Sequence, residues 1–550
     1  MFRTTYESVP IAPDRVAGAD EVVMLRVVLF DGAGGVESSS LVGVVRVGDV
    51  IAQIVVTTSG AEYVAGAPVI ASAVDEVTRL VQLSLHRVAH RRELFGVRRV
   101  SNSFSGYNAG VASTPRSIMW FRRDLRLVDN PALIAAGADG AEVVPVFVID
   151  PTFASSGAPR LAYLHGALRS LDASIRRHSG AGLVIRHGDP SSVMPALATE
   201  TGADTVFVAR DYSPYGRRRD GVVKLALERD GRHLKGVGSP YAVGPGNVTK
   251  DDGAPYAVFT PFSKVWRRVG WDLPVDAPGD DFRWAGDSGV GSEPLGDRPD
   301  PGIELPEAGE GAARDLWSHF VRTDGVDDYA DRRNLPAVAG TSKLSPALKW
   351  GTIHPRQLLA DLDASGAGSK GHTVFSSELA WREFYADVLH QQPRTAWENL
   401  NSKMDAMPVD TDAAAQQRFD RWAAGETGFG IVDAGMRQLA SSGWMHNRLR
   451  MIVASFLVKD LHLPWQWGAR WFMQHLIDGD LASNNHGWQW AAGTGTDAAP
   501  YFRVFNPHLQ QERYDPDGEY VARWVTNPVE PMVDHKAERD EALRRLKSIN

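Results

Sequence analysis

The stretch SIMWFRRDLRLVDNP, residues 117–131, opens the part of the chain whose pattern decides the fold. It starts with a short apolar run of strand type. Three more such runs follow it, EVVPVFVID at 142–150, GLVIRHGD at 182–189 and DTVFVAR at 204–210. Stretches with helical patterns lie between and after these runs, at 160–180, 190–202 and 214–231. Alternating strands and helices predict an α/β domain with a doubly wound parallel sheet and helices on both faces.

The loop after the first predicted strand lacks the glycine-rich turn of a dinucleotide-binding domain. RRDLRLVDNP stands there instead, and GPGNVT at 244–249 is too short and misplaced to be that fingerprint. We therefore expect no NAD site on this sheet.

The rest of the chain is organised differently. Residues 246–310 are rich in Gly, Pro and Asp, which predicts a long linker after an α/β domain spanning 116–245. Helical periods dominate residues 311–550 and predict an all-α second domain.

Residues 1–115 show no chemical motif. Segments 21–32 and 40–60 are Val-rich and strand-like, and 71–97 has an amphipathic helical pattern. Two interpretations stand. Either these residues form a small extra domain, or the start of translation was assigned too far upstream and the protein begins near Val111 or Met119.

Composition narrows the class of protein. The chain has 550 residues, 43% of them hydrophobic, and a formal net charge of −8, which excludes a wholly basic nucleic-acid binder but not a local basic face. It has no cysteine, so disulfides, thiolate metal sites and cysteine nucleophiles are excluded. Because neither a signal pattern nor an apolar run of about 18 residues is found, we expect a cytoplasmic protein without a membrane span.

The stretch SSELAWREFYADVL, residues 376–389, predicts a helix with chemistry on one face. Glu378, Trp381, Arg382 and Tyr385 share that face through their i, i+3, i+4 and i+7 spacing. The face is either one wall of a binding site or a surface ion pair beside core aromatics.

A second helical stripe is predicted in GWMHNRLRMIVASFLVKDL, residues 443–461. Trp444, Asn447, Arg448 and Met451 lie along it, with Arg450 on a neighbouring line. This set suits a nucleobase and a phosphate, because Arg offers phosphate a planar fork and Met gives rings a soft contact. A buried helix with a snorkelling Arg is the alternative.

Two loops complete the candidate chemistry. Tyr329 precedes GTSKLSP at 340–346, a hydroxyl-rich turn that suits phosphate oxygens or an ordinary helix cap. In DGDLASNNHGWQW at 478–490, two carboxylates precede an amide, and they suit general acid–base work or pairing with a buried Arg. Neither loop has metal-ligand spacing, so we expect no metal site.

Taken together, five segments resemble the photolyase/cryptochrome family. In chain order these are MWFRRDLRLVDNPAL, GTSKLSPALKWG, ELAWREFY, the run from Thr427 to Leu461, and the run from Asp478 to Pro507. The resemblance covers about residues 117–545. It implies an antenna chromophore on the α/β domain and FAD in the helical domain.

The resemblance also implies site residues. Those expected to bind FAD are Tyr329, Thr341, Ser342, Lys343, Leu344, Ser345, Arg382, Arg450, Asp478, Asp480 and Asn484. Within this set, Asp478 is expected to pair with Arg450, and Asp480 and Asn484 to face the edge of the flavin ring. A flipped pyrimidine dimer is expected to meet Glu378, Trp381, Asn447, Met451 and Trp490, while Arg333 and Arg448 hold the flanking DNA phosphates.

The residues in these motifs favour one branch of the family. WMHNRLRM, with Asn447 and Met451, is similar to class I photolyases that repair cyclobutane pyrimidine dimers, and Asn484 is the residue type of photolyases. The resemblance therefore implies light-dependent dimer repair by electron transfer from excited reduced FAD, in a monomer that binds damaged DNA. A cryptochrome-type blue-light receptor is the alternative, and a redox flavoprotein with a diffusible substrate is a third reading.

The chain departs from the family pattern at the electron relay. Trp488 and Trp465 match the first two tryptophans, but Val409 aligns with the third. Either Trp471 or Trp397 substitutes, or photoreduction is weak; we expect slow photoreduction with repair intact.

A further departure concerns the antenna. Gly216, in SPYGRRRD, stands where folate-type members carry an acidic residue. The expected antenna is 8-hydroxy-5-deazaflavin, with methenyltetrahydrofolate as the alternative.

Overall fold

The computed structural model describes residues 3–10, 21–30, 36–47, 50–59, 114–286, 290–365, 368–496 and 502–549. They belong to two compact units, Met1–Ala109 and Gly110–Asn550. In the first unit, an antiparallel sheet has the order β1 (Arg3–Pro10), β2 (Glu21–Phe30), β3 (Val36–Val47), β4 (Val50–Ser59). The strand-like segments of the sequence thus form strands, and the helix predicted at 71–97 lies outside the described residues.

The second unit begins with a parallel five-stranded sheet of order β7-β6-β5-β8-β9. Its strands are β5 (Arg116–Phe121), β6 (Glu142–Ile149), β7 (Val184–His187), β8 (Thr205–Val208) and β9 (His233–Gly236). The four predicted strands are confirmed. The edge strand β9 was missed, because HLKG is short and only half-buried.

Helices cover both faces of this sheet, as predicted. They are α2 (Pro131–Ala136), α3 (Ala158–Ser179), α4 (Pro190–Thr201) and α5 (Pro214–Arg229). Alternate side chains of a strand point to opposite faces, so Met119 and Phe121 pack under α2 and α3 while Ile118 and Trp120 pack under α4 and α5. The carboxyl end of β5 therefore projects Arg122 and Arg123 from the middle of the sheet.

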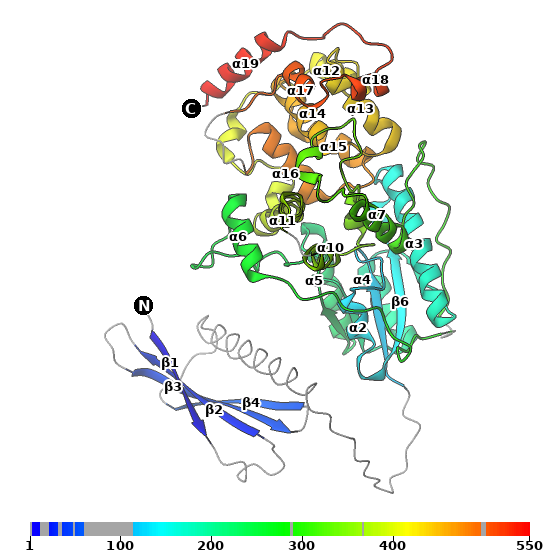
Figure 1. Ribbon diagram of the computed structural model, residues 1–550. Helices are drawn as coiled ribbons and strands as arrows, with labels where there is room; N and C mark the ends of the chain where they lie inside the picture. The colour runs from blue at the N-terminus through cyan, green and yellow to red at the C-terminus, as the bar shows by residue number, and fades with distance from the viewer. Residues whose placement is uncertain are drawn as a thin grey trace. The chain divides into compact units, whose positions relative to one another are not determined.

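Helices dominate the remainder, shown from green to red in Figure 1. They are α6 (Phe259–Val269), α7 (Glu310–Arg322), α8 (Tyr329–Arg332), α9 (Ser345–Trp350), α10 (Pro355–Ala364), α11 (Lys370–Gln391), η4 (Pro393–Ala396), η5 (Ser402–Ala406), α12 (Ala413–Ala424), α13 (Gly430–Ser442), α14 (Asn447–Lys459), α15 (Trp465–His475), α16 (Leu481–Ala492), α17 (Pro507–Tyr514), α18 (Glu519–Trp524) and α19 (His535–Lys547). Among the described helices, none combines the length and the hydropathy needed to span a bilayer.

The predicted linker contains a helix that the sequence did not predict. In α6, Phe262 and Trp266 are buried one turn apart. The Trp266 indole donates a 2.6 Å hydrogen bond to Glu383 of α11, which also accepts the backbone N–H groups of Ala242 and Val243. This part of the linker is therefore packed onto the helical region.

Candidate active site

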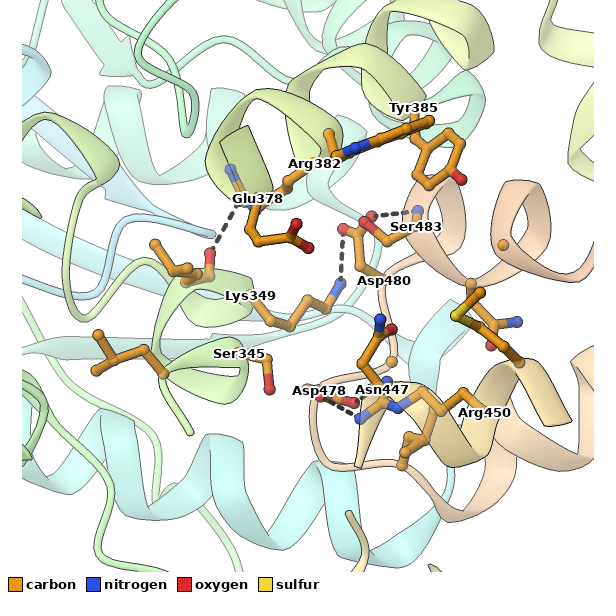
Figure 2. A pocket seen from close by; sticks show the side chains of 18 of the residues that line it. Ser345, Lys349, Glu378, Arg382, Tyr385, Asn447, Arg450, Asp478, Asp480 and Ser483 are labelled. Atoms are coloured by element: carbon orange, nitrogen blue, oxygen red, sulfur yellow. Dashed lines mark hydrogen bonds and ion pairs between the residues drawn. The ribbon is translucent and has the colours of Figure 1, made fainter. Parts of the chain in front are cut away.

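One cavity of about 490 Å³ lies where α11, α14 and α16 meet the turn before α9. The predicted residues that line it are Tyr329, Arg333, Ser342, Leu344, Ser345, Glu378, Trp381, Arg382, Asn447, Arg448, Arg450, Met451, Asp478, Asp480, Asn484, Trp488 and Trp490. Figure 2 shows side chains from these segments converging on one space. Segments far apart in the sequence thus form a single site.

The predicted stripe on α11 faces this cavity. Glu378, Trp381, Arg382 and Tyr385 all line it, as their helical spacing requires. Trp381 stacks on Phe259 with ring centroids 3.8 Å apart. The Arg382 guanidinium donates 3.0 Å hydrogen bonds to two backbone carbonyls, those of Pro240 and Leu348. Both acceptors are neutral, and the charge of Arg382 acts on the nearby Asp480 carboxylate.

Two residues with separate expected roles are paired with each other. Arg333, expected on a DNA phosphate, forms an ion pair with Glu378, expected on a pyrimidine edge. Both side chains are partly exposed at the cavity, 22% and 31%. Any ligand that takes either group has to compete with this ion pair.

Helix α14 begins at Asn447, one residue after its cap His446, which accepts the backbone N–H of Arg448. Trp444 therefore precedes the helix, and the predicted stripe is shorter than expected because of this cap. Burial lowers the pKa of His446 to about 4. The buried imidazole of His446, which does not line the cavity, is therefore neutral at neutral pH.

The predicted ion pair between Arg450 and Asp478 forms. Two guanidinium nitrogens of Arg450 donate to the two carboxylate oxygens of Asp478, at 3.2 and 2.7 Å, and Nε donates to the Met445 carbonyl at 2.8 Å. Bidentate geometry fixes the plane of the guanidinium. The pair therefore forms a rigid, neutral part of the wall.

Only part of the hydroxyl-rich turn lines the cavity. Ser342, Leu344 and Ser345 line the cavity, whereas Thr341 and Lys343 are not among the lining residues. Lys343 has a left-handed φ of 52° and places its ammonium 5.6 Å from the centre of the Trp444 ring. The Lys343 side chain thus lies against Trp444 and is not part of the cavity lining.

Asp480 is the centre of a charged cluster that the sequence did not reveal. It caps α16 by accepting the Ser483 N–H at 3.2 Å, accepts Arg123 at 2.6 Å, and lies 4.0 Å from the Lys349 ammonium. Burial opposes ionisation of Asp480, but Arg123, Lys349 and Arg382 outweigh it and hold the pKa of Asp480 far below its ordinary value. Asp480 is therefore ionised at neutral pH, which disfavours it as a general acid.

The tryptophans form a buried group beside the cavity. Trp488 lines the cavity and contacts Trp422 with ring centroids 6.0 Å apart, and Phe419 links Trp422 to Trp467 and Trp471 at 5.5 to 5.9 Å. The predicted relay residue Trp465 donates its indole N–H to Asn399 at 2.9 Å. Trp422 was missed because its contact with Trp488 leaves no periodic signal.

Other parts of the chain carry less chemistry. Within the described ranges, no three His, Asp or Glu side chains are arranged to hold a metal ion. At the predicted antenna segment, Gly216 lies so close to the Asp211 carboxylate that a Cβ would overlap it, and Arg219 pairs with Asp211 at 3.1 Å.

Comparisons with known proteins match two segments of the chain to family models and find similar sequences and solved structures. Residues 117–279 match the family described as DNA photolyase, and 375–528 match the FAD binding domain of DNA photolyase. A deoxyribodipyrimidine photo-lyase of Halobacterium salinarum is 41% identical over 74% of this chain and 88% of its own length. A class III photolyase structure from Agrobacterium tumefaciens superimposes with a TM-score of 0.72 at 34% identity, covering 80% of this chain and 99% of that one. An archaeal photolyase from Sulfolobus tokodaii with two FAD molecules gives 0.68 at 28% identity, covering 79% and 100%.

Proposed function

This chain belongs to the DNA photolyase family, and on that premise we propose that it repairs cyclobutane pyrimidine dimers in DNA with light. The observation that carries the proposal is the single cavity in which a flavin-type donor set and a pyrimidine-type wall meet. Its volume lies within the roughly 300–1,000 Å³ of cofactor and ligand sites.

The residues present fit FAD. The Ser342 and Ser345 hydroxyls and the Arg382 guanidinium suit a diphosphate, and the Trp488 indole N–H is buried without a hydrogen-bond partner among the described residues. Tyr329, Asp480 and Asn484 complete the proposed holding set. When bound and reduced, FAD supplies the light-driven electron that splits the dimer.

The opposite wall suits the lesion. Extruding a damaged dinucleotide from the duplex costs a few kcal/mol, and less for a distorted lesion. Trp381 and Trp490 provide apolar faces for the extruded bases, and Glu378 and Asn447 provide hydrogen bonds to their edges. Arg448, which donates a 2.7 Å hydrogen bond to Asn334, is the residue that we propose to hold a flanking phosphate.

We propose that the chain is a class I dimer-repair enzyme, because WMHNRLRM resembles that class and its Asn447 and Met451 line the cavity. Purified chain with reduced FAD should restore thymine absorbance from a cyclobutane-dimer oligonucleotide under blue light and not in the dark. Repair of a (6-4) photoproduct oligonucleotide in its place would reassign the substrate. Repair of neither by FAD-loaded protein would favour a light receptor.

For the antenna we propose 8-hydroxy-5-deazaflavin over methenyltetrahydrofolate. Gly216 supplies no carboxylate, and the nearby Asp211 is held by Arg219, with its pKa lowered to about 2 despite burial. Chromophore extracted from chain produced in a deazaflavin-making host should carry the deazaflavin spectrum. A folate spectrum would overturn this assignment.

A further inference from the structure

The Arg382 guanidinium lines the cavity (Figure 2) and is held there by neutral groups. It donates 3.0 Å hydrogen bonds to the carbonyls of Pro240 and Leu348, and its central carbon lies 4.6 Å from the centre of the Tyr241 ring. In the part of the chain that the structure describes, Arg382 forms no ion pair, and Asp480 acts on it only at longer range. Two of its three contacts therefore come from adjacent residues of one loop segment.

The carboxylate of the next residue on α11, Glu383, holds this segment. Its Oε1 accepts the backbone N–H of Ala242 at 2.5 Å, and its Oε2 accepts the N–H of Val243 at 2.9 Å and the Trp266 indole N–H at 2.6 Å. Glu383 is buried, and hydrogen bonds to a carboxylate are roughly twice as strong as neutral ones. Because these amides directly follow the two contacting residues, Glu383 fixes the backbone on which the guanidinium rests.

Glu383 is not among the residues that line the cavity. Successive residues of an α-helix point about 100° apart, so Arg382 faces the cavity while Glu383 faces the loop segment behind it. Glu383 can thus act on a ligand only through its neighbours. A second buried carboxylate, Asp387, stands one turn later on α11 and accepts the N–H of Gly246 at 2.7 Å. It holds the same segment at a point that has no contact with Arg382.

We propose that Glu383 is a positioning residue for FAD: through the backbone of residues 240–243 it holds the Arg382 guanidinium in the orientation that binds the diphosphate. The inference rests on the proposed function, since it needs FAD in this cavity. A guanidinium binds phosphate oxygens through a planar fork, so a change in its tilt weakens both bonds of the fork. Gln at position 383 would turn an NH2 group toward N–H groups that the carboxylate now accepts, and the segment would shift.

The rate at which the loaded full-length chain releases FAD, followed by the rise of flavin fluorescence after dilution, tests the proposal. Glu383→Gln should release FAD about tenfold faster, because a hydrogen bond to a charged group is worth about that factor in affinity. Asp387→Asn is the matched control. It should lower the thermal unfolding midpoint as Glu383→Gln does, and should release FAD at the wild-type rate. Glu383→Asp keeps the charge on a shorter side chain, so its release rate should lie between those of wild type and Glu383→Gln.

The Arg382→Met background shows whether the effect passes through the guanidinium. Arg382→Met alone should speed the release of FAD. Adding Glu383→Gln to it should change the release rate by less than about twofold, because the group that Glu383 positions is gone. A loss of about tenfold in both backgrounds would overturn the proposal, since Glu383 would then act on the cavity as a whole.

Three other results would also overturn it. The first is wild-type release in Glu383→Gln or, if that variant does not fold, in Glu383→Asp. The second is equally fast release in Asp387→Asn, and the third is unchanged release in Arg382→Met. Dimer repair by the wild-type sample separates the two ideas: repair together with any of these results refutes only the role of Glu383, whereas failure of wild type to bind FAD refutes the proposed function.

Discussion

Replacing Glu378 with Gln tests whether the ion pair with Arg333 restrains the proposed DNA-binding side of the cavity. The substitution keeps the size of the side chain and removes its charge, so Arg333 loses its partner. Because both side chains are 22–31% exposed, solvent screening limits the pair to about 1 kcal/mol. Freed from this competition, Arg333 should bind undamaged DNA up to about fivefold more tightly.

The assay is fluorescence anisotropy with an undamaged duplex at one fixed salt concentration, since phosphate contacts depend strongly on salt. Asp172→Asn is the matched control, because it frees Arg176 on α3 in the same way, at an exposed pair on the α/β domain. Dimer repair by Glu378→Gln should fall, since Gln carries no charge to organise the lesion wall.

The double variant Glu378→Gln/Arg333→Ala tests whether the gain in DNA affinity acts through Arg333. Its affinity for undamaged DNA should equal that of Arg333→Ala alone, because the gain acts only through Arg333. An unchanged or weaker affinity in Glu378→Gln, or a gain that persists without Arg333, would refute the argument.

Three further predictions follow from single contacts. Trp422→Phe should slow photoreduction of oxidised FAD more than Trp397→Phe does, because Trp422 contacts Trp488 whereas Trp397 is 40% exposed. Flavin absorbance follows the photoreduction. Equal rates in both variants would contradict an electron route through Trp422. Gly468→Ala should lower the stability of FAD-free protein by roughly 1–3 kcal/mol, because a Cβ there overlaps the Trp488 ring, whereas Gly487→Ala, with open space at its Cβ, should not. Lys349 is protonated below pH 10.5 in the unfolded chain but only below about pH 7 in the folded chain. The free energy of unfolding of wild type, relative to Lys349→Met, should therefore rise from pH 7 to 9 by up to about 1.4 kcal/mol per pH unit. A difference in thermal unfolding that does not change with pH would contradict the lowered pKa of Lys349.

The sequence predicted the features that depend on local period. The parallel sheet follows from strands such as Ile118–Phe121, whose alternate side chains feed two cores. The stripe from Glu378 to Tyr385 faces the cavity because helical spacing alone sets its direction. Arg450 and Asp478 were paired correctly only through the family resemblance.

What the sequence did not predict depends on contacts between distant segments. Arg123 and Asp480 are 357 residues apart, and no pattern in either segment indicates that they meet. Lys349 meets Asp480, and Trp422 meets Trp488, in the same way, from segments far apart in the sequence. Trp444 was placed on the α14 stripe because the capping role of His446 was overlooked.

The most direct test of the central claim is repair by the Glu378→Ala/Asn447→Ala variant, compared with wild type at equal content of reduced FAD. Both side chains line the cavity, on the wall proposed for the lesion, and neither belongs to the proposed FAD-holding set. Wild type should restore thymine absorbance from dimer-containing DNA under blue light and not in the dark, and the double variant should lose that recovery while it keeps its flavin. Full recovery by the double variant, or none by FAD-loaded wild type, would contradict the assignment of this cavity as the site of dimer repair.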